Sequence, residues 1–253
     1  MPYLDRDGVK VYYEVHGDGP AMLLTHGYSA SARMWEGQVQ HFKDRYKVIV
    51  WDMRGHGRSD SPEDQALYTE EATVEDMAAL LRACGADRGI IGGLSLGGYM
   101  SMAFNVAHPE MVSALMLFDT GPGYRNPQGR EAWNETAYNR AKAFEERGLE
   151  ALGGGAEVGV SAHTSAAGLA KAARGMLAQF DSRVIESLEG IKAPTLVLVG
   201  ANDRAFLNAT DYMAAKIPGA TRVVIPDAGH AANIDQPEAF NRAVDEFLAK
   251  LPL

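Results

Sequence analysis

The chain has 253 residues, 46% hydrophobic and 23% charged, a balance typical of a soluble globular protein with one large core. The formal net charge of −9 argues against nucleic acid and anionic membrane surfaces as partners, because both need a basic face on the protein. The single cysteine, Cys84, excludes an internal disulfide. No apolar run has the length of a membrane span, and acidic residues stand where a signal peptide would be apolar, so we expect a cytoplasmic protein.

Apolar runs alternate with amphipathic segments along the chain. Residues 3–15 carry β-formers around the turn signal Asp7-Gly8 and predict a hairpin. Short apolar runs predict further strands at residues 21–25, 47–51, 88–92, 112–118, 195–199 and 221–225. Helical spacing predicts helices at residues 31–43, 73–83 (with Thr73 as N-cap and Asp76 as its capping-box partner), 96–107, 208–216 and 238–250. This alternation implies an α/β fold: a mostly parallel sheet flanked by helices, with ligands beyond the carboxyl ends of the strands.

The regular alternation stops between residues 120 and 190. This stretch contains a loop at Gly121-Pro122-Gly123, a helix-like run at 128–147, a triple-glycine break and Ala-rich helical material to about Gln179. We interpret residues 120–190 as an insertion (hereafter the insertion) that covers the cleft as a small helical cap. Residues 1–119 and 191–253 then form the core domain, and a second domain in place of the cap is the alternative.

The pattern Gly93-x-Ser95-x-Gly97 joins an apolar run to a helix-like segment. It matches the nucleophile elbow, in which a serine stands on a strained strand-to-helix turn and the glycines let strand and helix approach. A Gly-rich turn that cradles phosphate is the alternative, but no lysine follows Gly98 as a P-loop requires. Ser95 is therefore the candidate nucleophile.

A serine hydroxyl needs a neighbouring imidazole to take its proton. His230 is the leading candidate among seven histidines, because it follows a predicted strand and a turn. His26 and His56 also lie in loops at the cleft, where their glycine neighbours suit structural hydrogen bonds better. His163 lies in the insertion and follows no core strand.

The imidazole in turn needs a carboxylate that fixes its tautomer. Asp203 follows the strand 195–199 and is favoured by position and chain order over Asp119 and Asp227. The two oxyanion donors are expected to be the backbone N–H groups of Leu96, after the nucleophile, and Tyr28, after strand 21–25.

The order Ser95, Asp203, His230 resembles the α/β-hydrolase superfamily. The loop His26-Gly27-Tyr28, the segment Asp52-x-Arg54-Gly55-x-Gly57-x-Ser59 and the ending Gly229-His230-x-x-x-x-Asp235-x-Pro237 are similar to that superfamily as well. The resemblance covers the whole chain and implies an eight-stranded, mostly parallel sheet with the cap between strands 6 and 7. It is greatest to small single-cap enzymes such as carboxylesterases, enol-lactonases and C–C bond hydrolases. A serine nucleophile differs from the aspartate of haloalkane dehalogenases and epoxide hydrolases.

The resemblance implies two-step acyl transfer on a small ester or lactone, without a metal or other cofactor. Candidates to line the acyl pocket are aromatic and methionine side chains, each of which can also be plain core: Tyr99, Trp133, Tyr138, Met176, Phe180 and Phe206. A C–C bond hydrolase or perhydrolase on the same triad remains an alternative, and so does a receptor that binds a small molecule without turnover. The sequence leaves a monomer and a homodimer equally open.

Overall fold

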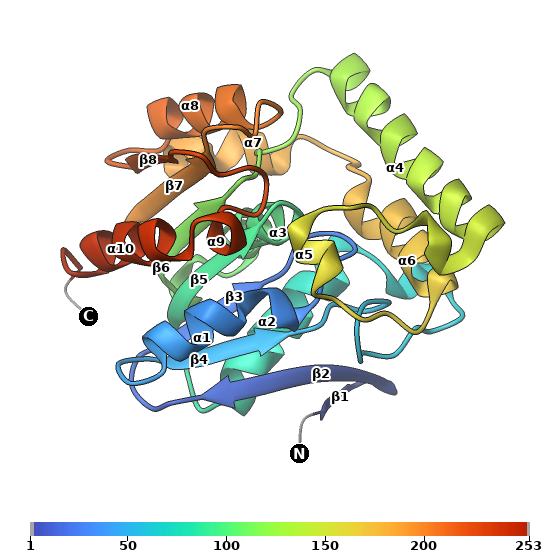
Figure 1. Cartoon of the computed structure of the whole chain (residues 1–253), viewed down its shortest axis with the longest axis horizontal. Helices are drawn as coiled ribbons and strands as arrows, with labels where there is room; N and C mark the ends of the chain where they lie inside the picture. The colour runs from blue at the N-terminus through green and yellow to red at the C-terminus, as the bar shows by residue number, and fades with distance from the viewer. Residues whose placement is uncertain (1–2, 252–253) are drawn as a thin grey trace.

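The architecture is a single sheet between two layers of helices, with the insertion at one end (Figure 1). The computed structural model describes residues 3–251. Its strands are β1 (Tyr3–Arg6), β2 (Val9–His16), β3 (Ala21–Thr25), β4 (Lys47–Trp51), β5 (Gly89–Leu94), β6 (Val112–Phe118), β7 (Thr195–Gly200) and β8 (Thr221–Ile225). Its helices are α1 (Glu36–Phe42), α2 (Glu70–Ala83), α3 (Leu96–Ala107), α4 (Pro127–Arg147), α5 (Ala156–Gly159), α6 (Ala166–Ala172), α7 (Arg183–Ser187), α8 (Leu207–Lys216), α9 (Ala232–Asp235) and α10 (Pro237–Leu248).

The eight described strands lie in the order β1-β2-β4-β3-β5-β6-β7-β8. β1 and β2 form the predicted hairpin, with positive φ at Asp7 and Gly8, and β2 pairs antiparallel to β4. All remaining pairs are parallel. The expected eight-stranded, mostly parallel sheet is confirmed. The insertion lies between strands β6 and β7 in the chain.

The two faces of the sheet carry separate apolar cores. Leu23 and Ile49 face the core that contains α2, α3, α7 and α8, whereas Leu24 and Val50 face the core beneath α1 and α10. Side chains of successive strand residues point to opposite faces, so a strand buried on both faces must be apolar throughout. This explains why the central strands read as continuous apolar runs in the sequence.

Helix α2 begins earlier than the spacing predicts, and the prediction of Thr73 as its N-cap is wrong. Thr69 holds that position, and its hydroxyl accepts a 3.0 Å hydrogen bond from the Ala72 N–H. Thr73 instead donates back to the Thr69 carbonyl from within the first turn, at 2.8 Å. Asp76 is unavailable for a capping box because Arg54 binds both of its carboxylate oxygens, at 2.7 and 2.9 Å.

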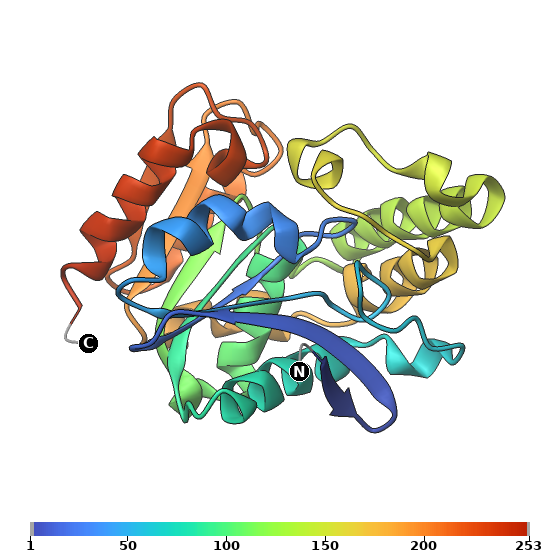
Figure 2. The ribbon, with the colours of Figure 1, turned by 60° about the horizontal axis from the view of Figure 1, so that its bottom comes forward.

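The insertion contributes α4 and α6, which pack on each other beside the sheet, on the right in Figures 1 and 2, and α5, which lies nearer the sheet and contacts α9. Its last helix, α7, returns to pack on α3. The Ala-rich helical material that the sequence predicts to about Gln179 is divided into α5, α6 and a single π-type turn at Ala173–Leu177. Across residues 3–251, no helix combines the length and apolarity needed to cross a membrane.

Candidate active site

Ser95 stands between β5 and α3 in a backbone conformation that few side chains adopt, with φ 56° and ψ −117°. Its N–H donates to the Phe118 carbonyl of β6 at 2.9 Å, which fixes the turn to the neighbouring strand. A Cβ added at Gly93 would lie 2.3 Å from the Gly97 carbonyl carbon, and one added at Gly97 would lie 2.1 Å from the Thr25 oxygen. The strand and the helix approach this closely only because both positions are glycine.

His230 and Asp203 meet at the end of the sheet. The Nδ1–H of His230 donates to Asp203 Oδ2 at 2.7 Å. Asp203 follows β7, and His230 lies on the loop between β8 and α9. That loop is held by Asp235, whose carboxylate accepts the Gly229 N–H at 2.7 Å. The Asp203 side chain is only 6% exposed, so its charge acts on the imidazole with little screening by water.

The surroundings of His230 favour its protonated form. Burial alone would lower the pKa of His230, but the hydrogen bond and the charge of Asp203 outweigh this effect. The carboxylates of Asp119 and Glu157 act in the same direction as Asp203, and the net result is a pKa above the usual value. A raised pKa makes the imidazole a stronger proton acceptor.

The two rival acids have other surroundings. Asp119, at the end of β6, accepts the Gly200 N–H at 2.7 Å with Oδ1, while Oδ2 is buried without a hydrogen-bond partner in the described residues. Burial raises the pKa of Asp119 well above its usual value. Asp227 is exposed and lies in a turn with φ 58°. Of the three acids, Asp203 is therefore the one bonded to the imidazole.

The hydroxyl of Ser95 and the His230 ring make no direct hydrogen bond within residues 3–251. The Phe206 ring stacks on His230 with centroids 5.2 Å apart and lines the same cavity as Ser95, so His230 lies next to a residue of the cavity wall. Hydrogen bonds of a catalytic site are often long before substrate binds.

Two backbone N–H groups remain open beside Ser95. Leu96 is the first residue of α3, where helical N–H groups have no partner within the helix. Tyr28 follows β3, and in the described part of the chain neither its N–H nor that of Leu96 donates to a protein acceptor. The sequence analysis expects these two N–H groups to be the oxyanion donors.

The histidines of the cleft loops have structural hydrogen bonds, as their glycine neighbours suggest. His26 Nδ1 donates to the Gly27 carbonyl at 2.7 Å, and its Nε2 accepts the Met53 N–H at 3.0 Å. His56 Nδ1 donates to the Arg54 carbonyl at 3.1 Å. His26 therefore has no nitrogen left for the Ser95 proton.

A cavity of about 120 Å³ opens beside Ser95. Uncharged side chains and glycines line it: Ser95, Leu96, Tyr99, Thr120, Gly121, Pro122, Gly123, Tyr124, Trp133, Leu177, Gln179, Ala205, Phe206 and Ala209. Of the six predicted pocket residues, Tyr99, Trp133 and Phe206 are among them. Met176 is buried in the core instead, 1% exposed.

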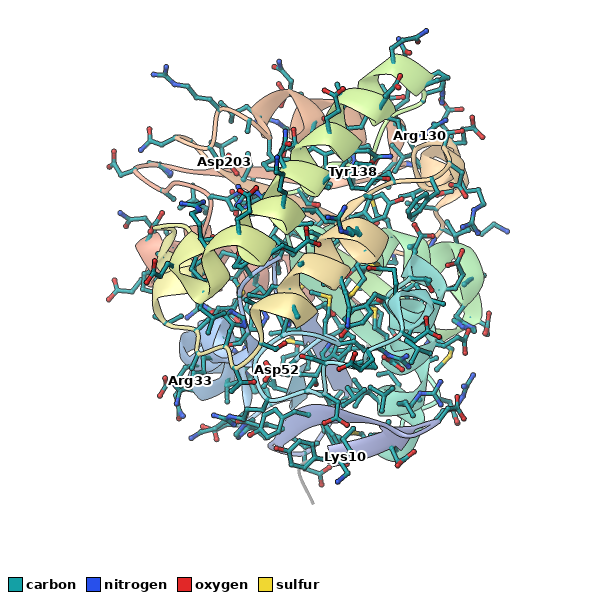
Figure 3. The ribbon with its side chains drawn as sticks, turned by 90° about the vertical axis from the view of Figure 1, so that its right-hand side faces the viewer. Lys10, Arg33, Asp52, Arg130, Tyr138 and Asp203 are labelled. Atoms are coloured by element: carbon teal, nitrogen blue, oxygen red, sulfur yellow. The ribbon has the colours of Figure 1, made fainter. Side chains whose placement is uncertain are left out.

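Tyr138 and Phe180 lie outside this cavity. They line a separate hollow on the outer surface of the insertion, 40% and 65% exposed. Figure 3 shows Tyr138 on α4, on the side turned to the viewer. Residue type identified them as candidates, but only the packing of α4 against α6 decides which of its residues face inward.

The model of the alpha/beta hydrolase family matches residues 22–243. The chain belongs to the alpha/beta hydrolase family. It is 28% identical to 3-oxoadipate enol-lactonase 2 of Acinetobacter baylyi, over 98% of this chain and 96% of the relative. It is 26% identical to a putative 2-succinyl-6-hydroxy-2,4-cyclohexadiene-1-carboxylate synthase of Bacillus subtilis, over 97% of each chain. A malate-bound esterase from Thermogutta terrifontis superposes with a TM-score of 0.84 at 29% identity, covering 99% of this chain and 97% of the other.

The hydrolase segment from Asp52 to Ser59 supports the cleft without lining the cavity beside Ser95. Asp52 Oδ1 accepts the Ala32 N–H at 2.7 Å and Oδ2 accepts the Arg58 N–H at 2.8 Å. A Cβ added at Gly57 would lie 2.2 Å from Asp52 Oδ2, which explains the glycine. The segment thus fixes the backbone just after the loop that contains Tyr28.

Sequence reasoning did not identify two polar residues of the cavity wall, Thr120 and Gln179. Thr120 donates to the Ser95 carbonyl at 2.6 Å, and its place two residues after β6 was a signal for this role. Gln179 is held by Asn134 through two 2.7 Å bonds to its backbone, and no local pattern marks such a contact. Among residues 3–251, no three His, Cys, Asp or Glu side chains are arranged to hold a metal ion.

Proposed function

We propose that the chain is a serine hydrolase that cleaves small carboxylic esters or lactones with Ser95 as nucleophile, His230 as base and Asp203 as the orienting acid. The 2.7 Å bond between His230 Nδ1 and Asp203 carries this proposal, because it leaves Nε2 as the proton acceptor. Relatives named as an enol-lactonase and an esterase support a hydrolase that acts on ester bonds. The insertion, residues 120–190, is the proposed cap on a core domain of residues 1–119 and 191–253.

The reaction has two steps. Ser95 Oγ attacks the ester carbonyl carbon while its proton passes to His230 Nε2. The oxyanion that forms accepts hydrogen bonds from the backbone N–H groups of Tyr28 and Leu96. The tetrahedral intermediate then expels the alcohol, which takes the proton from His230, and an acyl-Ser95 ester remains. Water attacks this ester, gives its proton to His230, and releases the acid as Ser95 regains its hydrogen.

The cavity favours a small, neutral acyl group. Its volume of about 120 Å³ is well below the roughly 300–1,000 Å³ of pockets for drug-sized ligands. In the described residues no charged side chain lines it, so a carboxylate on the acyl chain would lose water without gaining a cation. Behind Tyr99, the Glu70 carboxylate accepts the tyrosine hydroxyl at 2.9 Å and pairs with Arg183 at 3.3 Å, so this pair adds no net positive charge.

Hydrolysis of p-nitrophenyl butyrate tests the triad. The Ser95→Ala variant should lose turnover by about 10⁴-fold or more, whereas Ser113→Ala, at the opposite end of the sheet, should retain it. A fluorophosphonate should add its mass to the wild type and not to Ser95→Ala. Undiminished turnover by Ser95→Ala would exclude the proposed nucleophile, and binding of the ester without turnover would support a receptor.

A matched pair of substrates tests the neutral cavity. The p-nitrophenyl ester of valeric acid and the mono-p-nitrophenyl ester of succinic acid differ mainly in a terminal carboxylate. We expect kcat/KM to be at least about tenfold higher for the valerate, a difference of about 1.4 kcal/mol in transition-state binding. A preference for the succinate would contradict the neutral acyl site and leave the triad untouched.

A further inference from the structure

The loop that carries the Tyr28 N–H contains a strained residue. Residues 27–31 (the oxyanion loop) begin with a tight turn, which the Ala30 N–H closes on the Gly27 carbonyl at 3.1 Å. Ser29 lies in this turn with φ 56°. A non-glycine residue in this region costs on the order of 1 kcal/mol or more and persists only where its surroundings hold it. The orientation of this turn determines where the Tyr28 N–H points.

The insertion holds the oxyanion loop by side-chain hydrogen bonds at both of its ends. The Tyr28 hydroxyl donates to the Leu169 carbonyl of α6 at 2.8 Å. The Ser31 hydroxyl donates to the Ser161 hydroxyl at 3.1 Å. Both partners belong to residues 120–190, so the conformation of this core loop depends on the insertion.

His163, from the segment between α5 and α6, contacts the strained residue itself. Its Nε2 donates to the Ser29 carbonyl at 2.9 Å, and its Nδ1 accepts the Gly57 N–H at 3.1 Å. A neutral imidazole has one donor and one acceptor, and these two contacts require the hydrogen on Nε2. One ring thus joins the loop after β3 to the loop after β4.

The surroundings keep this ring neutral. Burial lowers the pKa of His163, and it outweighs the opposing effects of the Ser29 hydrogen bond and the Asp52 charge. The His56 ring lies 6.0 Å away, centroid to centroid. On the core side of the same turn, His26 donates to the Gly27 carbonyl at 2.7 Å. The turn is therefore held by one histidine from the core and one from the insertion.

We propose that His163 is a positioning residue for ester hydrolysis: its bond to the Ser29 carbonyl holds the oxyanion loop so that the Tyr28 N–H points at the developing oxyanion. This inference rests on the proposed function. In the described residues the two ring hydrogen bonds of His163 go to Ser29 and Gly57, and His163 does not line the cavity beside Ser95, so it acts through the loop and not on the substrate.

The size of the effect follows from the donor that would be lost. Removing one oxyanion donor lowers kcat by about 10²–10³-fold. A displaced loop retains part of this interaction, so we expect a loss of about 10- to 100-fold in kcat. KM should change by less than about threefold, because the ground-state carbonyl depends little on this donor.

Two conservative variants separate the two contacts of the ring. His163→Gln places an amide N–H where Nε2 donates to Ser29, but has no acceptor at the Nδ1 position. His163→Asn places an oxygen where Nδ1 accepts the Gly57 N–H, but does not reach Ser29. We expect the glutamine variant to retain kcat within about threefold, and the asparagine variant to show the full loss. His41→Gln and His41→Asn, on an exposed histidine, are the matched controls.

An inhibitor distinguishes positioning from simple destabilisation. Addition of the serine hydroxyl to a methyl trifluoromethyl ketone gives a bound oxyanion, whereas butyramide, an uncharged analogue of the acyl group, binds without a negative oxygen. In His163→Asn the affinity for the ketone should fall in parallel with kcat/KM, while the affinity for butyramide is retained. A merely structural role would lower the unfolding temperature of both variants without this selective loss.

The outcomes test the positioning role of His163 and the proposed function separately. If the wild type has Ser95-dependent turnover and His163→Asn equals it in kcat and in ketone affinity, the positioning role is excluded and the proposed function stands. The role is also excluded if the glutamine and asparagine variants lose kcat equally. If the wild type lacks Ser95-dependent turnover, the proposed function itself fails.

Discussion

At the scale of single residues, Asp203 and Asp119 both act on the charge of His230, but only Asp203 touches the ring. We expect Asp203→Asn to lower kcat by about 10⁴-fold, because an amide favours the wrong imidazole tautomer. Asp119→Asn keeps an oxygen for the Gly200 N–H and should retain kcat within about tenfold. Steady-state kinetics of the two variants checks this, and the opposite order would make Asp119 the catalytic acid.

The contact between His230 and Asp203 also predicts the direction in which kcat/KM changes with pH. In the proposed mechanism the imidazole must be neutral, and the pKa of His230 is raised, so kcat/KM should fall as the pH drops through a value above about 6.5. Asp203→Asn removes the main cause of the raised pKa and should move this acid limb to lower pH. A limb that stays in place in Asp203→Asn would show that another group titrates there.

The sequence predicts least well which side chains of the insertion line the cavity. Ser95, Asp203 and His230 could be proposed because each lies in the turn or loop that follows a recognisable core strand. Tyr138 and Phe180 were chosen only for their size, and they face outward. Helix α4 is polar on most of its surface, so its sequence does not show which side packs inward.

At the scale of elements, the nucleophile elbow between β5 and α3 is the turn that most restricts which residues can occupy it. In Gly97→Ala the new Cβ would meet the Thr25 backbone at 2.1 Å, so β3 and α3 must separate and Ser95 must move. We expect a loss of about 1–3 kcal/mol in unfolding free energy and of most esterase activity. Gly37→Ala, in α1 with open space around it, should be neutral or stabilising. Urea unfolding and p-nitrophenyl butyrate hydrolysis test both variants.

Elements of the core were predictable because each buries an apolar run or stripe that the sequence displays. Helix α10, for example, spaces Phe240, Val244 and Phe247 on one buried face. The predicted start of α2 is wrong because Thr69 and Thr73 both suit an N-cap, and the local pattern does not show that Asp76 binds Arg54 in place of capping the helix. The short helices α7 and α9 carry too few residues to show a period.

At the scale of the whole molecule, a cluster of three neutral histidines, two of them buried and one half-buried, joins the core to the insertion. The rings of His26 and His56 have centroids 5.0 Å apart, and His163 lies on the other side of His56 at 6.0 Å. Burial lowers the pKa of His26 to about 4 and that of His56 well below its usual value. The carboxylate of Asp52 offsets this only in part at His26.

These lowered pKa values make folding sensitive to acid. Below about pH 6.5 the unfolded histidines take up protons that the folded cluster excludes, so stability falls by at most about 1.4 kcal/mol per pH unit and per histidine. His230, whose pKa is raised, has the opposite sign, but its contribution is already complete below about pH 6.5. Asp119 also opposes the trend, since its raised pKa stabilises the folded state as pH falls.

Replacing one member of the cluster isolates its contribution. His56→Asn can keep the donor to the Arg54 carbonyl and has nothing to titrate. Urea unfolding at about pH 7 and about pH 5 should show a smaller loss of stability in His56→Asn than in the wild type. Gln40→Asn, an exposed control that removes no titratable group, should follow the wild type. Because Asp119 and His230 are unchanged in all three proteins, equal losses of stability in all three would mean that protonation of His56 does not oppose folding.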